Sequence, residues 1–337
     1  RRTATAVAFL ALLSAGCQAS SHSPVRAHAA APVPTAAAPS PTASAAPKVD
    51  PRSVHADELG VVPVLMYHQL LAHPKGDYDQ TPAQFRAELT ALYRSGYRTV
   101  TAADLVAGRV DVPAGRSPMV LTFDDSTISQ YAERPDGSVD PGTAVGILED
   151  VAHRFGEQHP VATFYVNAAP FRGHDSYLAH LAALGMEIGD HTATHANLRQ
   201  LDATGVQREL VQGLAVITGA VPGVRVTTMA LPFGAHPRDR QLSARGSWQG
   251  RSYAFSGVLL VGSNPSRSPY SKDFTPQALP RIRSGLRTGD QAFTSTYWLP
   301  RLLKTRFVSD GDPATISFPR SEVGRLAPRF ARQARPY

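Results

Sequence analysis

The chain has 337 residues, of which 42% are hydrophobic and 18% are charged, so it can form one large domain or two small ones, and a coiled coil or a highly charged disordered protein is excluded. The formal net charge is +7, but the excess lies in the N-terminal segment and in residues 320–337, which contain five Arg. Residues 58–319 carry no net charge, so we expect no broad phosphate-binding surface and no nucleic acid partner.

Residues 1–17 have the pattern of an export signal. Arg1 and Arg2 precede an apolar run, Ala6–Leu13, that is too short to span a bilayer as a helix. A positive start, a short apolar stretch and small residues after it are typical of a secretory signal peptide.

Cys17 follows these small residues and is the only cysteine, so no intramolecular disulfide can form. Its position resembles the lipobox of bacterial lipoproteins, in which the cysteine becomes a lipid-modified N-terminus, although Ser14 stands where Leu is usual. We therefore expect lipidation of Cys17 and an exported protein anchored at the outer face of a bacterial cell membrane. The alternative is an ordinary signal peptide that is cleaved elsewhere, which gives a secreted protein.

Residues 18–57 are rich in Ala, Pro, Ser and Thr. Such a segment cannot bury a core, and we expect a disordered linker between the anchor and the body. At ~3 Å per residue, an extended linker of this kind would hold the body up to about 100 Å from the membrane.

From residue 58 onward, short apolar runs alternate with amphipathic helical patterns. We expect strands at 61–67, 97–100, 119–123, 161–166, 186–188, 227–231 and 253–261, and helices from Pro82 to Gly96 and at 102–107, 177–184 and 203–217. Residues 132–146 are expected to be a loop insertion. Strands that alternate with helices predict an α/β fold with a parallel sheet, open or closed into a barrel.

An acidic pair, Asp124-Asp125, follows the buried strand 119–123 directly. Two carboxylates at such a place are costly unless something neutralises them. Since neighbouring side chains of an extended chain point apart, one can bind a cation while the other faces a substrate. The alternative is a helix N-cap, because Ser126 and Thr127 come next.

Three further candidates also follow predicted strands. His191 and His195 are spaced i, i+4, which on a helical turn lets both imidazoles bind one metal ion, although a coincidental surface pair is the alternative. His68 ends the first strand and is either catalytic or packed, and Leu231-Pro232-Phe233-Gly234 is either part of a site or a simple turn. Because the carboxyl ends of parallel strands meet, two His and one Asp with an open position would form a catalytic metal site there.

Residues 61–319 resemble the polysaccharide deacetylases (NodB homology domain, carbohydrate esterase family 4), and more closely the permuted branch that includes the exopolysaccharide poly-N-acetylglucosamine deacetylases, which open with a similar Pro-Val-Leu-Met-Tyr-His. The resemblance implies a distorted (β/α) barrel over residues 58–319. It also implies these roles: Asp124 as catalytic base, Asp125, His191 and His195 as metal ligands, Pro232, Phe233 and Gly234 as groove residues with a backbone N–H for the oxyanion, and His68 as general acid.

The implied reaction is hydrolysis of a linear amide, the removal of N-acetyl groups from an N-acetylglucosamine polymer at the cell surface. The implied cofactor is a divalent metal, expected to be Zn²⁺, with Co²⁺, Ni²⁺ or Mn²⁺ as alternatives. Peptidoglycan and an O-acetyl ester are alternative substrates, and a catalytically impaired glycan-binding lipoprotein is an alternative function. Oligomeric state cannot be inferred.

Two positions depart from the family pattern. Leu231 stands where an Arg would pair with the catalytic Asp, and Ser126 stands where the family has Gly. Arg281 or Arg283 could replace the missing cation. The basic residues 320–337 are expected to be a solvated tail. Its functional alternatives are weak attraction to anionic wall polymers and the attachment of the protein as a scaffold. The aromatic residues Trp248, Tyr297 and Trp298 could stack on sugars or pack in the core.

Overall fold

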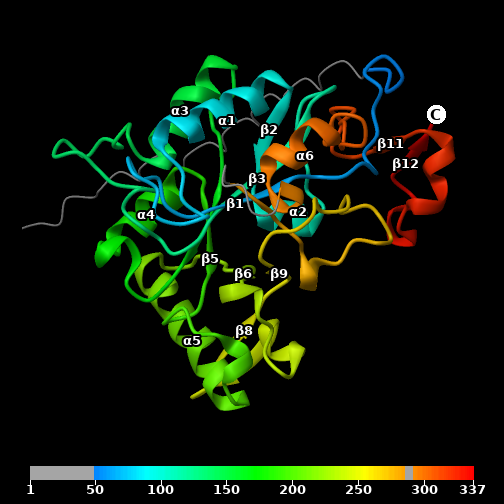
Figure 1. Ribbon diagram of the computed structural model, residues 1–337. Helices are drawn as coiled ribbons and strands as arrows, with labels where there is room; N and C mark the ends of the chain where they lie inside the picture. The colour runs from blue at the N-terminus through cyan, green and yellow to red at the C-terminus, as the bar shows by residue number, and fades with distance from the viewer. Residues whose placement is uncertain (1–48, 285–290) are drawn as a thin grey trace, which may run out of the picture. The chain divides into compact units, whose positions relative to one another are not determined.

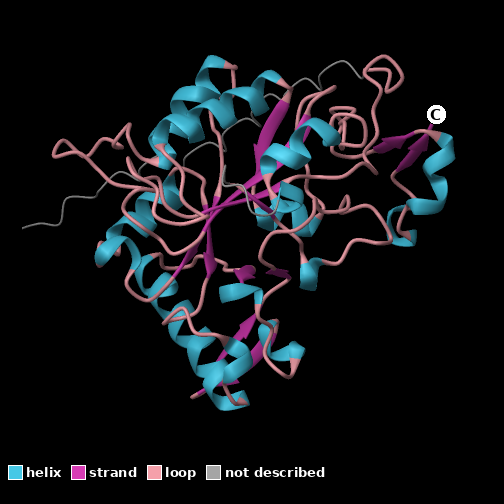
Figure 2. Ribbon diagram, viewed as in Figure 1, coloured by secondary structure: helices cyan, strands magenta, loops and turns pink. Residues whose placement is uncertain are grey.

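The fold is organised by a parallel sheet of eight short strands with helices packed against it, as the computed structural model of residues 49–284 and 291–337 shows (Figures 1 and 2). Its strand order is β10-β1-β3-β4-β5-β6-β9, and β2 also pairs with β3. The strands are β1 (Val64–Tyr67), β2 (Tyr97–Val100), β3 (Ser117–Phe123), β4 (Thr163–Val166), β5 (Glu187–Asp190), β6 (Thr228–Ala230), β9 (Gly257–Leu259) and β10 (Ile282–Arg283). The predicted α/β architecture with a parallel sheet is confirmed.

Helices connect the strands, as expected for parallel neighbours. They are α1 (Pro82–Arg94), α2 (Ala102–Ala107), α3 (Ala144–Arg154), α4 (Ser176–Ala183), α5 (Ala203–Ala220) and α6 (Ser295–Leu302). Helix α1 starts where the sequence predicted: Thr81 and Gln84 form a capping box, Pro82 occupies the first turn, and Phe85 and Leu89 are buried. Among the described residues, no helix has the length and apolar character needed to cross a membrane.

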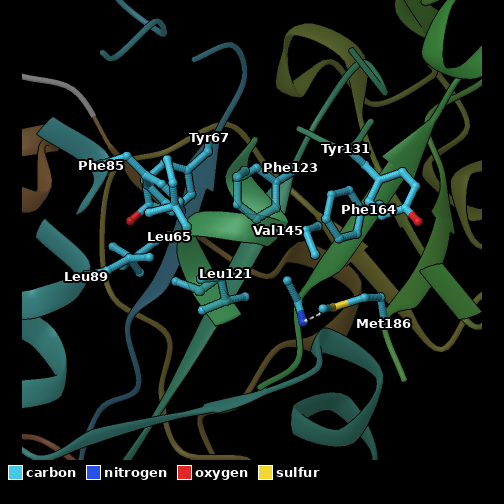
Figure 3. Close-up of a cluster of buried hydrophobic side chains, with 14 of the residues drawn as sticks. Leu65, Tyr67, Phe85, Leu89, Leu121, Phe123, Tyr131, Val145, Phe164 and Met186 are labelled. Carbon is cyan, nitrogen blue, oxygen red and sulfur yellow. Dashed lines mark hydrogen bonds between the residues drawn. The ribbon is translucent and has the colours of Figure 1, made fainter. Parts of the chain in front are cut away.

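The main core lies between this sheet and helices α1 and α3 (Figure 3). Phe123 at the end of β3 stacks on Tyr67 of β1 and on Phe164 of β4, with ring centroids 5.3 and 5.0 Å apart. Full burial of such a ring stabilises the fold by roughly 1.5–3 kcal/mol. Because Phe123 is held from both sides, the backbone that follows it leaves the sheet at a fixed point.

The structure corrects several predicted elements. Helix α3 was missed, and it begins inside the expected loop 132–146 because Thr143 caps it by accepting a hydrogen bond from Gly146 N. The expected strand 253–261 is two strands: β8 (Arg251–Ala254), which forms an antiparallel hairpin with β7 (Arg245–Trp248), and β9. The strand is interrupted between β8 and β9 because the N–H groups of Phe255 and Ser256 donate to the carbonyl oxygens of Ala244 and Thr227.

Two expected domain boundaries also move. Residues 49–57 of the predicted linker belong to the folded body, where Ala56 is fully buried and Asp57 pairs with Val308. The C-terminal residues do not form a free tail: β12 (Ala334–Pro336) pairs in parallel with β11 (Ile316–Phe318). The predicted signal peptide, the lipidated Cys17 and most of the linker lie outside the described residues, and they stay predictions.

The C-terminal segment is attached to the beginning of the body by specific bonds. Arg325 Nη2 donates to the carbonyl oxygen of Leu59 at 2.7 Å, and Tyr337 Oη donates to that of Ala56 at 2.8 Å. Phe330 packs edge-on against Tyr270, with centroids 5.2 Å apart. Its arginines therefore help to hold the fold, which a purely solvated tail would not do.

We predict that deletion of residues 320–337 lowers the melting temperature, because it removes β12 and exposes the buried side chains of β11. Tyr337→Phe serves as the matched control, since it loses one hydrogen bond and should cost only about 0.5–1.5 kcal/mol. Differential scanning calorimetry of the two variants and the parent makes the comparison. An unchanged melting temperature in the deletion would mean that the segment is dispensable for folding.

Candidate functional site

The site lies where neighbouring parallel strands end. Strand β3 leads into Asp124 and Asp125, β5 leads into His191, and β1 leads into His68. The sequence separates these residues by as much as 123 positions, but the pairing of β1 with β3, β3 with β4 and β4 with β5 brings them to one edge of the sheet. The expectation that the candidate residues converge is met.

Three of them form a constellation that suits a metal ion. One ligand atom each from Asp125, His191 and His195 lies within 4.8 Å of the other two. The Nε2 atoms of both histidines are 3.5 Å from Asp125 Oδ1.

The hydrogen bonding of His191 tests whether this constellation fits a metal. Its Nδ1 lies 2.8 Å from the carbonyl oxygen of Ala230, which can only accept, so Nδ1 carries the proton and Nε2 has a free lone pair. That Nε2 is buried and has no hydrogen-bond partner among the described residues. A backbone carbonyl that accepts from one imidazole nitrogen, and leaves the other nitrogen to bind the ion, is a usual arrangement around a metal-binding His. The residues therefore fit a divalent ion that accepts nitrogen and oxygen ligands.

The two histidines do not lie on a helical turn, which corrects the expectation drawn from their i, i+4 spacing. They lie on a loop in which Thr192 and His195 have φ values of +66° and +56°. Non-glycine residues in this left-handed region are strained, and the surrounding bonds must compensate. The Oδ1 atom of Asp190 accepts from Thr192 N at 2.6 Å, and Glu209 of α5 accepts from both the backbone and the hydroxyl of Thr194.

Asp124 is buried, and its Oδ2 atom lies 4.0 Å from His191 Nε2. The guanidinium of Arg281 forms two parallel hydrogen bonds with it, Nη1 to Oδ1 at 2.7 Å and Nη2 to Oδ2 at 2.8 Å. Burial alone would raise the pKa of Asp124, but the Arg281 guanidinium beside it outweighs burial and holds that pKa below its usual range. Asp124 is therefore an ionised carboxylate inside the protein.

Arg281 is also fully buried, and each of its groups has a partner. Nε donates to the Leu260 carbonyl at 2.6 Å, and Nη1 also donates to Thr122 Oγ1 at 3.1 Å. Arg281 thus provides the cation that Leu231, a buried apolar residue here, cannot provide. Arg283, the other residue that the sequence suggested, lies elsewhere, with its guanidinium carbon 5.0 Å from the ring centroid of Tyr78.

His68 also approaches Asp124, with its Nε2 atom 4.0 Å from Oδ2. Its ring packs on Tyr78 with centroids 4.7 Å apart, and its Nδ1 is buried without a hydrogen-bond partner among the described residues. Burial lowers the pKa of His68, although Asp124 partly opposes this. Gln130 fixes the spacing of the two strand ends, because its Nε2 donates to the carbonyl oxygens of both His68 and Asp124.

The turn after β6 brings an aromatic side chain to the site. Phe233 is 64% exposed, and its ring lies edge-on to that of His195, with centroids 4.7 Å apart. Its φ is +58°, and Gly234 follows with φ +64° in a place where a Cβ would come within 3.1 Å of Val261. Pro232 is buried below them and anchors the turn.

Comparison with known proteins identifies the central part of the chain. Residues 111–246 match the family model described as polysaccharide deacetylase. This stretch is similar to the polysaccharide deacetylase family. The match contains the acidic pair, both histidines of the metal constellation and the turn at Phe233, whereas His68 and Arg281 lie outside it on either side.

Solved structures of deacetylases have the same fold. The deacetylase PplD of Streptococcus pyogenes, in complex with acetate, is 18% identical with a TM-score of 0.55, over 72% of this chain and 98% of that one. A polysaccharide deacetylase of Bacillus cereus is 21% identical with a TM-score of 0.54, over 72% and 69%. IcaB of Ammonifex degensii is 20% identical with a TM-score of 0.50, over 75% and 98%.

Sequence reasoning missed the residues that hold the candidate site in place. Tyr78, Gln130 and Glu209 contact site residues or the loop that bears them, but none belongs to a recognisable motif. Gln130 lies five residues after the acidic pair and is fully buried, which is unusual for a glutamine, yet burial cannot be read from the sequence.

We predict that Arg281→Met destabilises the folded protein by about 3–5 kcal/mol at neutral pH, because it leaves Asp124 charged, buried and unpaired. The folded-state pKa of Asp124 is lowered, so the pair stabilises the fold above the unfolded pKa, near 4, and this contribution is lost as the pH falls. Urea unfolding at pH 7 measures the effect. Adding Asp124→Asn to Arg281→Met should recover part of the loss, and equal stability of Arg281→Met and the parent would contradict the assigned role.

Proposed function

We propose that this protein is a metal-dependent hydrolase that removes N-acetyl groups from an N-acetylglucosamine-containing polysaccharide at the cell surface. The observation that carries the proposal is the juxtaposition of Asp125, His191 and His195 with a second carboxylate, Asp124, which Arg281 keeps ionised. A metal constellation beside a separate buried base is the arrangement that hydrolysis of an unactivated amide requires.

Asp125, His191 and His195 would hold a divalent ion, with Zn²⁺ expected. When bound, such an ion supplies Lewis acidity toward the acetamide carbonyl and lowers the pKa of a water molecule. Asp124 is the general base that accepts the proton of the attacking water. Its two bonds to Arg281 fix the direction in which its remaining lone pairs point, so the carboxylate requires little reorganisation during the reaction.

His68 is the general acid that donates a proton to the departing amine, which leaves glucosamine and acetate. Because burial lowers its pKa, a protonated His68 gives up its proton readily. The backbone N–H of Phe233 is proposed as an oxyanion donor. The exposed Phe233 ring offers an apolar surface for a sugar next to His195, with Pro232 and Gly234 completing that wall of the groove.

The cell-surface setting is part of the proposal. It rests on the predicted export signal, on lipidation of Cys17 and on the linker, which together would place the enzyme at the outer face of the membrane, next to wall and exported polymers. Peptidoglycan is the second candidate substrate, and a glycan-binding role without turnover is the second candidate function. The pairing of Arg281 with Asp124 weakens the case for a glycan-binding role without turnover. That role was suggested because Leu231 stands where the family has an Arg, and Arg281 supplies the cation instead.

Acetate release tests the proposal. Residues 49–337 are incubated with soluble N-acetylglucosamine oligomers, with and without a chelator and added Zn²⁺ or Co²⁺. We expect chelator-sensitive acetate release that Asp124→Asn reduces by roughly 10²–10⁴-fold while the bound metal is retained. His191→Ala should instead lose the metal, which elemental analysis measures.

Normal metal stoichiometry in His191→Ala would refute the ligand assignment. Saturable glycan binding without acetate release would refute turnover and favour the binding protein. A switch of preference from the oligomers to muramic-acid-containing fragments would identify peptidoglycan as the substrate.

We further predict that Tyr78→Ala lowers kcat by up to about 10²-fold with little change in KM, because His68 loses the ring that holds it beside Asp124. Tyr78→Phe keeps the ring and should retain activity. Steady-state kinetics of both variants on one oligomer provide the measurement. A rise in KM at constant kcat would show instead that Tyr78 binds the sugar.

A further inference from the structure

A cavity of about 610 Å³ lies apart from the metal constellation, and none of the constellation's residues lines it. Its apolar lining includes Val61, Pro280, Leu302 and the indole of Trp298. Asn264, Arg267 and Asp273 also line it with exposed polar side chains. The volume lies within the range of small-molecule and oligosaccharide-sized sites.

Trp298 is held rigidly at this cavity. Its ring is partly buried against the main core, and its indole N–H donates to the carbonyl oxygen of Ser263 at 3.1 Å. The one polar atom of the side chain is thus already bonded inside the protein, so the part of the ring that lines the cavity can offer only an apolar surface. A fixed aromatic ring of this kind loses little conformational entropy when a ligand packs on it.

The charged side chains at the cavity are free to bind a ligand. Within residues 49–284 and 291–337, neither Arg267 nor Asp273 takes part in an ion pair, and both are exposed. One positive, one negative and one amide group around an apolar floor do not select an ion of either sign. They suit a neutral ligand that carries hydroxyl groups on its edge and an apolar face.

We propose that this cavity is a secondary saccharide-binding site, which holds a neutral segment of the polymer away from the reacting acetamide. A pyranose ring has the required amphiphilic shape: its C–H face would pack on Trp298 and its hydroxyls would reach Asn264, Arg267 and Asp273. The inference rests on the proposed function for its choice of polymer, N-acetylglucosamine. Engagement of one chain at two places would raise affinity for long substrates over short ones.

The cavity and the catalytic base share a structural element. Ser263 N donates to the carbonyl oxygen of Arg281 at 2.5 Å, and the side chain of Arg281 holds Asp124. The segment that positions Trp298 is therefore bonded to the residue that positions the base. A backbone hydrogen bond thus joins the wall of the cavity to the residue that holds the proposed base.

The chain has only two tryptophans, which makes the test direct. Trp248→Phe leaves Trp298 as the only tryptophan fluorophore, and this protein is titrated with N-acetylglucosamine hexamer. We expect a saturable change in emission. The double substitution Asn264→Ala/Arg267→Ala, which alters only exposed side chains, should weaken the apparent affinity roughly tenfold or more.

The matched control is Gln249→Ala/Arg251→Ala on the β7–β8 hairpin, which should leave the titration unchanged. In kinetics, the Asn264/Arg267 variant should raise KM for the polymer while leaving turnover of a disaccharide unaltered. Acetate release with no fluorescence response, or with a response that Asn264→Ala/Arg267→Ala does not alter, overturns the second site and leaves the proposed function standing. A normal titration without acetate release in any variant supports the second site and refutes the proposed function.

Discussion

The buried pair of Asp124 and Arg281 is the interaction on which the rest of the site depends. A charged carboxylate next to two imidazoles and a second carboxylate would not stay ionised inside a protein without a cation that is equally well held. Arg281 meets this requirement because backbone and side-chain acceptors from β3 and from the segment after β9 satisfy its remaining N–H groups. The pair therefore ties strands from the beginning, middle and end of the body together at the point where chemistry is proposed.

The backbone around this pair is strained in the places where side chains must be aimed. Asp125, Ser126, Thr192, His195 and Phe233 all have positive φ without being glycine. Ser126 stands at a position where the resemblance to deacetylases suggested Gly, and its φ of +45° gives the physical reason for that preference. Such conformations persist only where surrounding hydrogen bonds hold the backbone in place. Here the side chains of Asp190, Glu209 and Asn167 form those hydrogen bonds with the loop that bears the two histidines.

Most strands of the sheet, although not β10, could be predicted from the sequence, and so could the residues that meet at the candidate site, because both leave local patterns. Buried strands appear as apolar runs, and the acidic pair and the paired histidines follow such runs directly. It was not sufficient for α3 or for the C-terminal strands, whose stability comes from distant contacts such as those of Arg325 and Tyr337 with the start of the body. The choice of Arg281 over Arg283 could not be made either, since residues at i and i+2 of an extended segment share a face. Only the three-dimensional contacts distinguish them, because Arg281 bonds to Asp124 whereas Arg283 lies over the Tyr78 ring.

The strand order explains how an N-terminal histidine and a C-terminal arginine can serve one carboxylate. Strand β1 lies between β10 and β3, so the end of β1 brings His68 to Asp124, and the entrance of β10 brings Arg281 to the same carboxylate. Hydrogen bonding within a parallel sheet fixes which strands are neighbours but does not depend on the order in which the chain supplies them. Strand β1, which leads to the proposed acid His68, can therefore come first in the sequence and still lie beside β3, which leads to the proposed base Asp124.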